Sequence, residues 1–172
     1  MSVFLLQILI LGVFPAAMAF AAASDLVTMT ISNWLQIVLI VAFGLIAILA
    51  QLPLETIGYH LLAFFVVLAI SFFCFARGWI GGGDAKLAAC TALWFGWAQA
   101  LYDYILLAAI LGGVLTLALL YFRRQTLPQR LANQNWIMRL HDEKQGIPYG
   151  IALAASALIV YSETALFMLV VH

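Results

Sequence analysis

Residues 104–122 read YILLAAILGGVLTLALLYF, a run without one charged side chain, and Arg123 and Arg124 follow it directly. A run of this length can cross the hydrocarbon core of a bilayer as a helix, which takes about 20 mostly apolar residues. The helical form follows because backbone N–H and C=O groups find no water there and must pair with each other. The stretch therefore predicts a membrane-spanning helix that ends at a positively charged loop.

The composition of the whole chain agrees with this prediction. Of 172 residues, 67% are hydrophobic and 8% are charged, whereas an average soluble domain has about 25% charged residues. Seven basic and seven acidic side chains cannot cover a water-soluble globule of this size. The formal net charge of zero also argues against a nucleic-acid binder, which needs a clustered excess of Lys and Arg. The bilayer is therefore the expected solvent.

Dividing the chain at its charges and at its Pro and Gly clusters gives six apolar segments of spanning length. They run approximately over residues 3–22, 34–50, 57–76, 85–102, 104–122 and 149–171. The expected fold class is therefore all-α, a polytopic membrane helix bundle with about six transmembrane helices. We expect one integral-membrane domain over residues 1–172, with a cytoplasmic loop at 123–148 and no separate soluble domain.

The first apolar segment could be mistaken for a secretory signal, because Ala17-Met18-Ala19 resembles a cleavage site. No Lys or Arg precedes it, and its charge-free stretch is longer than the roughly 7–15 apolar residues of a signal peptide. We therefore expect a helix that is retained.

The basic residues indicate which way the bundle faces. Five of the seven lie in the 123–148 loop, namely Arg123, Arg124, Arg130, Arg139 and Lys144. Loops rich in Lys and Arg stay in the cytoplasm, so this loop is expected there. Counting the spans back from it places the amino terminus outside and puts Asp25 and Asp84 at the cytoplasmic face.

Asp25 directly follows the first apolar segment, and Asp84 ends the sequence Gly81-Gly82-Gly83-Asp84 before the fourth. Two carboxylates held close together cannot both ionise freely, so the pair shares a proton. Such a pair can activate water with one member and protonate a leaving amine with the other. Each aspartate also has a simpler explanation, since Asp84 could cap a helix and Asp25 could lie in the headgroup region where its helix leaves the hydrocarbon.

Four short segments carry a family resemblance. They are Ser24-Asp25-Leu26, Ile31-Ser32-Asn33, Gly81-Gly82-Gly83-Asp84-Ala85-Lys86-Leu87 and Ile147-Pro148-Tyr149-Gly150. The first three resemble the type IV prepilin peptidase family, membrane aspartyl proteases with a Gly-x-Gly-Asp motif, and the last is similar to its short members that serve tight-adherence (Flp-type) pili.

The resemblance implies that Asp25 and Asp84 are the catalytic pair. It also implies a loop near the substrate, made of Gly81, Gly82, Gly83 and Lys86. Three glycines allow a peptide backbone to approach closely. Lys86 itself should point away from an inward-facing Asp84 and anchor at the headgroups.

The chain departs from its relatives in two ways. The first motif in relatives is usually followed by basic residues and then by Ile-Pro-Asn, whereas this chain has the uncharged residues 27–30 and then Ser32 in place of the proline. Longer relatives also carry paired Cys-x-x-Cys motifs and methylate the new pilin amino terminus. No Cys-x-x-Cys exists here, so methyltransferase activity is not implied, and Cys74 and Cys90 are expected to be packing residues.

These observations favour an aspartic endopeptidase, a prepilin peptidase that cleaves the short basic leader of prepilin-like proteins at the cytoplasmic face of the bacterial inner membrane. Its expected partners are a prepilin or pseudopilin and membrane lipid, with no nucleic acid, no cofactor and no metal. Two alternatives stay open, a catalytically inactive membrane factor for pilus assembly and a proton-coupled transporter subunit. Transport is disfavoured because ionisable groups at mid-depth are scarce; Glu163 is the exception and is assigned no role.

Overall fold

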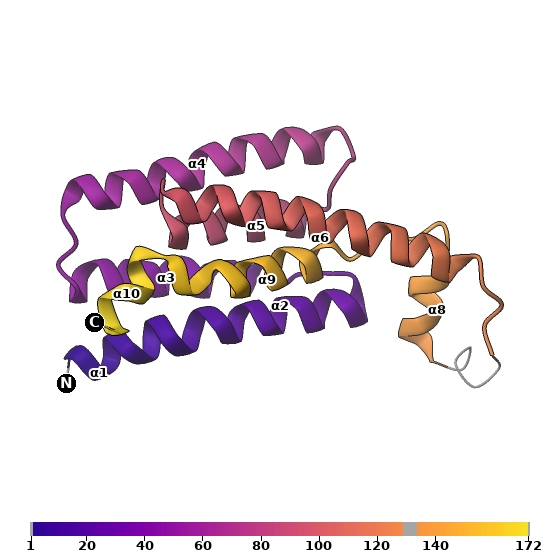
Figure 1. Ribbon diagram of the computed structural model, residues 1–172, viewed down its shortest axis with the longest axis horizontal. Coiled ribbons are helices and arrows are strands. Elements are labelled where there is room, and N and C mark those ends of the chain that lie inside the picture. The colour runs from indigo at the N-terminus through magenta and orange to yellow at the C-terminus, as the bar shows by residue number, and fades with distance from the viewer. Residues whose placement is uncertain (1, 129–133, 172) are drawn as a thin grey trace.

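The computed structural model describes residues 2–128 and 134–171, so Arg130 lies outside the described residues. Every regular element within those ranges is a helix, and none is a strand. Most of the helices run along one long axis, while the short helix α8 (Asn135–His141) stands at one end beside the end of α6 (Gln99–Arg123) (Figure 1). The expected all-α helix bundle is confirmed.

The other elements follow in chain order, with a π-helical segment η1 near the start and a 3-10 turn η2 near the end. They are α1 (Ser2–Gln7), η1 (Ile8–Val13), α2 (Phe14–Thr28), α3 (Asn33–Leu49), α4 (Leu54–Ala76), α5 (Gly82–Phe95), α9 (Tyr149–Val160), η2 (Tyr161–Glu163) and α10 (Ala165–Val171).

Three of the described helices are long and apolar enough to span a membrane, namely Val3–Thr28, Leu54–Ala76 and Gln99–Arg123. Counting α9 with η2 and α10 as one span, bent by 52°, gives a fourth. α3 is apolar but shorter, with 17 residues. The expectation of about six transmembrane helices is therefore not confirmed for the part of the chain that the structure describes.

α5 explains much of this difference. The expected fourth span, residues 85–102, is divided, because Gly96 adopts a left-handed φ of 70° and ends α5. The 14 residues of α5 cover about 21 Å at 1.5 Å per residue, less than the roughly 30 Å of hydrocarbon. Nearly all of α5 is buried from Leu87 to Phe95, and it packs against α3, α4 and α9. Its apolar residues therefore face protein rather than lipid.

A proline shapes the first helix. Pro15 has no N–H to donate, so the carbonyl of Ile10, five residues earlier, cannot form the bond that a π-helical turn would give it. The hydroxyl of Tyr161 donates to the Ile10 carbonyl oxygen instead, over 2.8 Å. The Tyr161 ring also stacks on Phe14, with centroids 4.3 Å apart. The carboxyl-terminal part of the bundle thus satisfies the backbone of the first helix.

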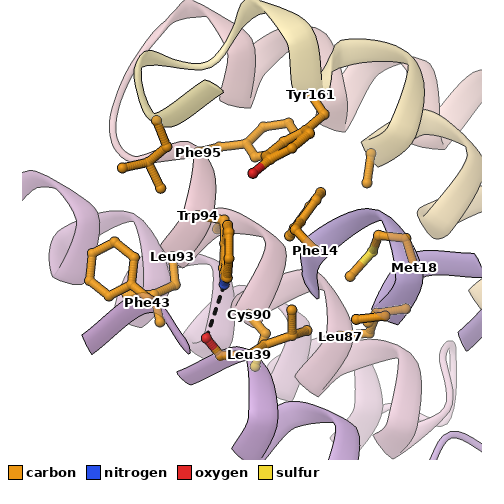
Figure 2. Close-up of a cluster of buried hydrophobic side chains, with 14 of the residues drawn as sticks. Phe14, Met18, Leu39, Phe43, Leu87, Cys90, Leu93, Trp94, Phe95 and Tyr161 are labelled. Carbon is orange, nitrogen blue, oxygen red and sulfur yellow. Dashed lines mark hydrogen bonds between the residues drawn. The ribbon is translucent and has the colours of Figure 1, made fainter. Parts of the chain in front are cut away.

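Aromatic side chains from α2, α5 and η2 meet at the centre of the bundle (Figure 2). Phe14 lies against Trp94 and Phe95, at ring-centroid distances of 5.0 and 5.9 Å. Trp94 is fully buried, and its indole N–H donates to the carbonyl oxygen of Leu39 over 3.0 Å. This hydrogen bond joins α3 to the carboxyl end of α5.

We expect Tyr161→Phe to lower the free energy of unfolding by about 1–3 kcal/mol, because it leaves the Ile10 carbonyl without a partner inside the protein. The measurement is thermal unfolding of the purified chain in detergent. Tyr121→Phe is the control, since Tyr121 is 69% exposed. Equal unfolding temperatures for Tyr161→Phe and the wild type would contradict this account of the first helix.

Candidate active site

Asp25 and Asp84 reach the same point from two different helices. Asp25 lies near the carboxyl end of α2 and Asp84 in the first turn of α5. Their side chains are 5% and 8% exposed, and both line the same two cavities. The structure therefore brings together the two carboxyl groups that the sequence singled out. Their catalytic role stays a prediction.

The two cavities share Asp25, Met29, Gly81 and Asp84 and differ in their other lining residues. The larger, of about 340 Å³, is also lined by Met29, by residues 78–81 and by residues 145–147 with Tyr149. The smaller, of about 300 Å³, is also lined by residues 29–31 and 81–83. Since the aspartates line both, a peptide chain passing from one cavity to the other would pass the two carboxyl groups.

Gly150, in the first turn of α9, binds the carboxyl group of Asp25. Its N–H donates to Asp25 Oδ2 over 2.8 Å, in a buried hydrogen bond. N–H groups in the first turn of a helix have no partner within the helix, so this one is free to serve Asp25. A side chain at this position would displace its neighbours, because a Cβ atom there would lie 2.8 Å from both Asp25 Oδ2 and Ile31 Cδ1. The amide of Gly150 therefore orients Asp25.

Sequence reasoning did not assign this role to Gly150. In the sequence, the segment Ile147-Pro148-Tyr149-Gly150 indicated only a family resemblance. A local signal was nevertheless present, because Pro148 before an apolar run is typical of a helix start. What the sequence could not supply is the contact between this helix start and a residue 125 positions earlier.

Asp84 occupies a desolvated position near a second negative charge. Burial raises the pKa of Asp84, and the neighbouring carboxylate of Asp25 raises it further, to about 7, while the backbone amides of Gly81 and Gly150 offset part of this rise. Asp84 is not the N-cap of α5, because Gly81 takes that position and Asp84 comes three residues later. Asp84 therefore holds a proton more readily than an exposed aspartate does.

The three glycines are positioned by close packing. A Cβ atom on Gly81 would lie 2.9 Å from Asp84 Oδ2, so a side chain there would displace the carboxyl group. Cβ atoms on Gly82 and Gly83 would lie 3.3 Å from Phe75 and 3.2 Å from Ile31. All three line the smaller cavity, and Gly81 lines both. Contact between these glycines and a substrate stays a prediction.

Lys86 lines neither of the two cavities. It is exposed, and its ammonium group donates to Asn33 Oδ1 over 2.8 Å, which ties the start of α5 to the start of α3. Ser32, which replaces the proline of the relatives, is the N-cap of α3 and accepts a hydrogen bond from the N–H of Trp34 over 3.3 Å. The departure at Ser32 thus supports a helix start beside the site.

The other polar residues noted in the sequence lie apart from the two cavities. Glu163 is exposed, in the turn between α9 and α10. Cys90 is buried and Cys74 half-buried, and both are free thiols. Across residues 2–128 and 134–171, no three His, Cys, Asp or Glu side chains gather as they would to hold a metal ion.

The chain matches the model of the type IV leader peptidase family over residues 12–117, which is more than half of its length. The chain belongs to the type IV leader peptidase family. Both aspartates and the three glycines fall within the matched range, whereas Gly150 and the cavity-lining residues 145–147 and Tyr149 lie beyond it. Comparisons with curated proteins and with solved structures found no match.

Family membership confirms the resemblance that the sequence motifs indicated. Members of the type IV leader peptidase family are aspartic peptidases, which supports a peptidase activity for this chain. Its long apolar helices further indicate a membrane protein.

We expect Gly150→Ala to lower peptidase activity by about tenfold or more, because the added methyl group displaces Asp25 and small misplacements of reacting groups are costly. Gly113→Ala is the control, since a Cβ atom there meets nothing within 4 Å. The measurement is the initial rate of substrate cleavage per amount of membrane-inserted enzyme. Wild-type activity in Gly150→Ala would show that this close contact is not needed.

Proposed function

We propose that this chain is a prepilin leader peptidase, an aspartyl endopeptidase that removes the short basic leader of prepilin-like proteins at the cytoplasmic face of the bacterial inner membrane. The observation that carries the proposal is the burial of Asp25 and Asp84 around shared cavities, close enough for one carboxylate to raise the pKa of the other. Two aspartates in this arrangement match the catalytic carboxyl groups of an aspartic peptidase.

The environments of the two carboxyl groups support different roles for them. Asp84 retains a proton near neutral pH, which suits a general acid. Asp25 accepts an N–H hydrogen bond, an interaction in which a carboxylate serves as the acceptor. We therefore assign Asp25 as the general base and Asp84 as the general acid.

In the reaction, a water molecule between the carboxyl groups attacks the carbonyl carbon of the scissile peptide bond. Asp25 accepts a proton from this water, and a tetrahedral intermediate forms. Asp84 donates its proton to the peptide nitrogen as the C–N bond breaks, which releases a carboxyl group on one product and an amine on the other. Transfer of the proton from Asp25 to Asp84 restores the starting pair.

Several features support a cytoplasmic site. The loop with most of the basic residues also supplies Gln145, Gly146 and Ile147 to the larger cavity. Arg139 of the same loop donates to the carbonyl oxygen of Val27, two residues after Asp25, over 3.3 Å. Since basic loops stay in the cytoplasm, the aspartates would face the compartment in which a basic leader is made.

The substrate that fits this arrangement is a prepilin or pseudopilin whose hydrophobic segment stays in the membrane while its leader reaches the larger cavity. The similarity of residues 147–150 to short family members favours tight-adherence pili as the setting. An inactive assembly factor is not favoured, because the altered loop residue Ser32 still caps a helix beside an intact pair of aspartates.

Replacing either aspartate tests the proposal. We expect Asp25→Asn and Asp84→Asn each to lower leader removal by about three orders of magnitude, because each variant lacks one half of the proton transfer. The assay incubates membranes that contain the enzyme with a prepilin and follows leader loss on gels. Asp103→Asn is the control, since Asp103 accepts a hydrogen bond from Gln99 in an exposed position on α6.

Cleavage at the wild-type rate by either aspartate variant would overturn the two-aspartate mechanism. If the wild type removes no leader from any prepilin encoded in the same genome, the assembly-factor alternative takes its place. Proton flux through the wild-type protein in liposomes would instead favour a transporter.

The reaction should also depend on pH. Because the pKa of Asp84 is raised to about 7, its acid form predominates below that pH and is lost above it. We expect kcat/KM to fall as the pH rises through about 7, by roughly tenfold per pH unit on the alkaline side, since kcat/KM reports the ionisation of the free enzyme. A constant kcat/KM from about pH 6 to 9 would exclude Asp84 as the general acid.

A further inference from the structure

The side chain of Arg123, the last residue of α6, binds three backbone carbonyl groups of the loop that follows. Its Nε donates to the carbonyl oxygen of Leu140 over 2.8 Å. Its Nη2 donates to those of Gly146 and Gln145, over 2.9 and 3.2 Å. A guanidinium group suits this task because its planar fork presents several N–H donors in fixed directions.

The segment that Arg123 binds forms one wall of the larger aspartate cavity. Gln145, Gly146 and Ile147 line that cavity together with residues 78–81. The segment lies between α8 and α9 and has no regular secondary structure of its own, and both Gln145 and Gly146 are exposed. Packing alone therefore does little to fix it, and the bonds from Arg123 are its direct attachment to a long helix.

The start of α9 has a separate attachment to α6. The hydroxyl groups of Tyr149 and Thr116 are hydrogen-bonded over 3.0 Å. The Tyr149 ring also packs closely on Gly112, where a Cβ atom would lie 3.1 Å from the ring. Loss of the Arg123 side chain should therefore move the cavity wall while Gly150 and Asp25 keep their places.

We propose that Arg123 is a positioning residue that holds Gln145–Ile147 as the wall against which the substrate binds, and so determines the KM of the enzyme for its substrate rather than kcat. The proposal rests on the peptidase function proposed above. Arg123 thereby does more than place a positive charge at the membrane surface. The exposed neighbour Arg124 can supply such a charge equally well.

Steady-state kinetics on the full-length chain in detergent or membranes separate these roles. For Arg123→Gln we expect KM for a prepilin to rise by about fivefold or more, with kcat within about twofold of the wild type. Arg123→Lys keeps the charge but lacks the planar guanidinium group, so KM should again be higher than in the wild type. Arg124→Gln removes the same charge from the next residue and should leave KM unchanged.

Three results would overturn the proposal. One is a wild-type KM in Arg123→Gln or in Arg123→Lys. Another is an equal rise of KM in Arg124→Gln, which would point to charge alone. The third is a fall in kcat at constant KM, which is what a smaller fraction of folded enzyme produces.

A second measurement tests, without any peptidase assay, whether the Arg123 side chain holds residues 145–147 in place. Lys144 is exposed in the same loop, so Lys144→Cys, with Cys74 and Cys90 replaced by alanine, can carry a spin label there. We expect Arg123→Gln, but not Arg124→Gln, to increase the mobility of this label at least about twofold in rotational rate. Unchanged mobility would overturn the proposal even if the enzyme cleaves its substrate. If the wild type cleaves nothing, the proposed function fails, and the label still decides whether Arg123 holds the loop.

Discussion

Two carboxyl groups held out of water beside each other impose the constraint on which the rest of this structure depends. They repel each other when both are ionised. A bundle can keep such a pair only if its other contacts hold the two backbones in place. The aromatic core around Phe14, Trp94 and Tyr161 and the hydrogen bond from Trp94 to α3 provide that rigidity.

Three helix ends converge to build the site. The carboxyl end of α2 carries Asp25, the first turn of α5 carries Asp84, and the first turn of α9 provides the amide of Gly150. α5 is short and packs against α3, α4 and α9, so most of its length faces protein rather than lipid.

The sequence predicted the helical bundle and placed both aspartates at one face, because a charge-free run has few ways to satisfy its backbone and basic loops share one side. The number of spans is not confirmed, since hydropathy cannot distinguish an apolar helix facing protein, such as α5, from one facing lipid. The sequence also missed the partners of Asp25 and of the loop wall. Gly150 and Arg123 act through contacts that depend on tertiary packing, which no local pattern encodes.

The hydrogen bond between Asp25 and Gly150 has a consequence for biosynthesis. The ribosome makes Gly150 125 residues after Asp25, so both aspartates enter the membrane before the helix that orients one of them exists. Since chains fold progressively during synthesis, Asp25 lacks its hydrogen bond from Gly150 until α9 has been made. The hydrogen bond from Tyr161 to the Ile10 carbonyl oxygen forms later still. The order of translation therefore delays completion of the contacts around the two aspartates until α9 has been made.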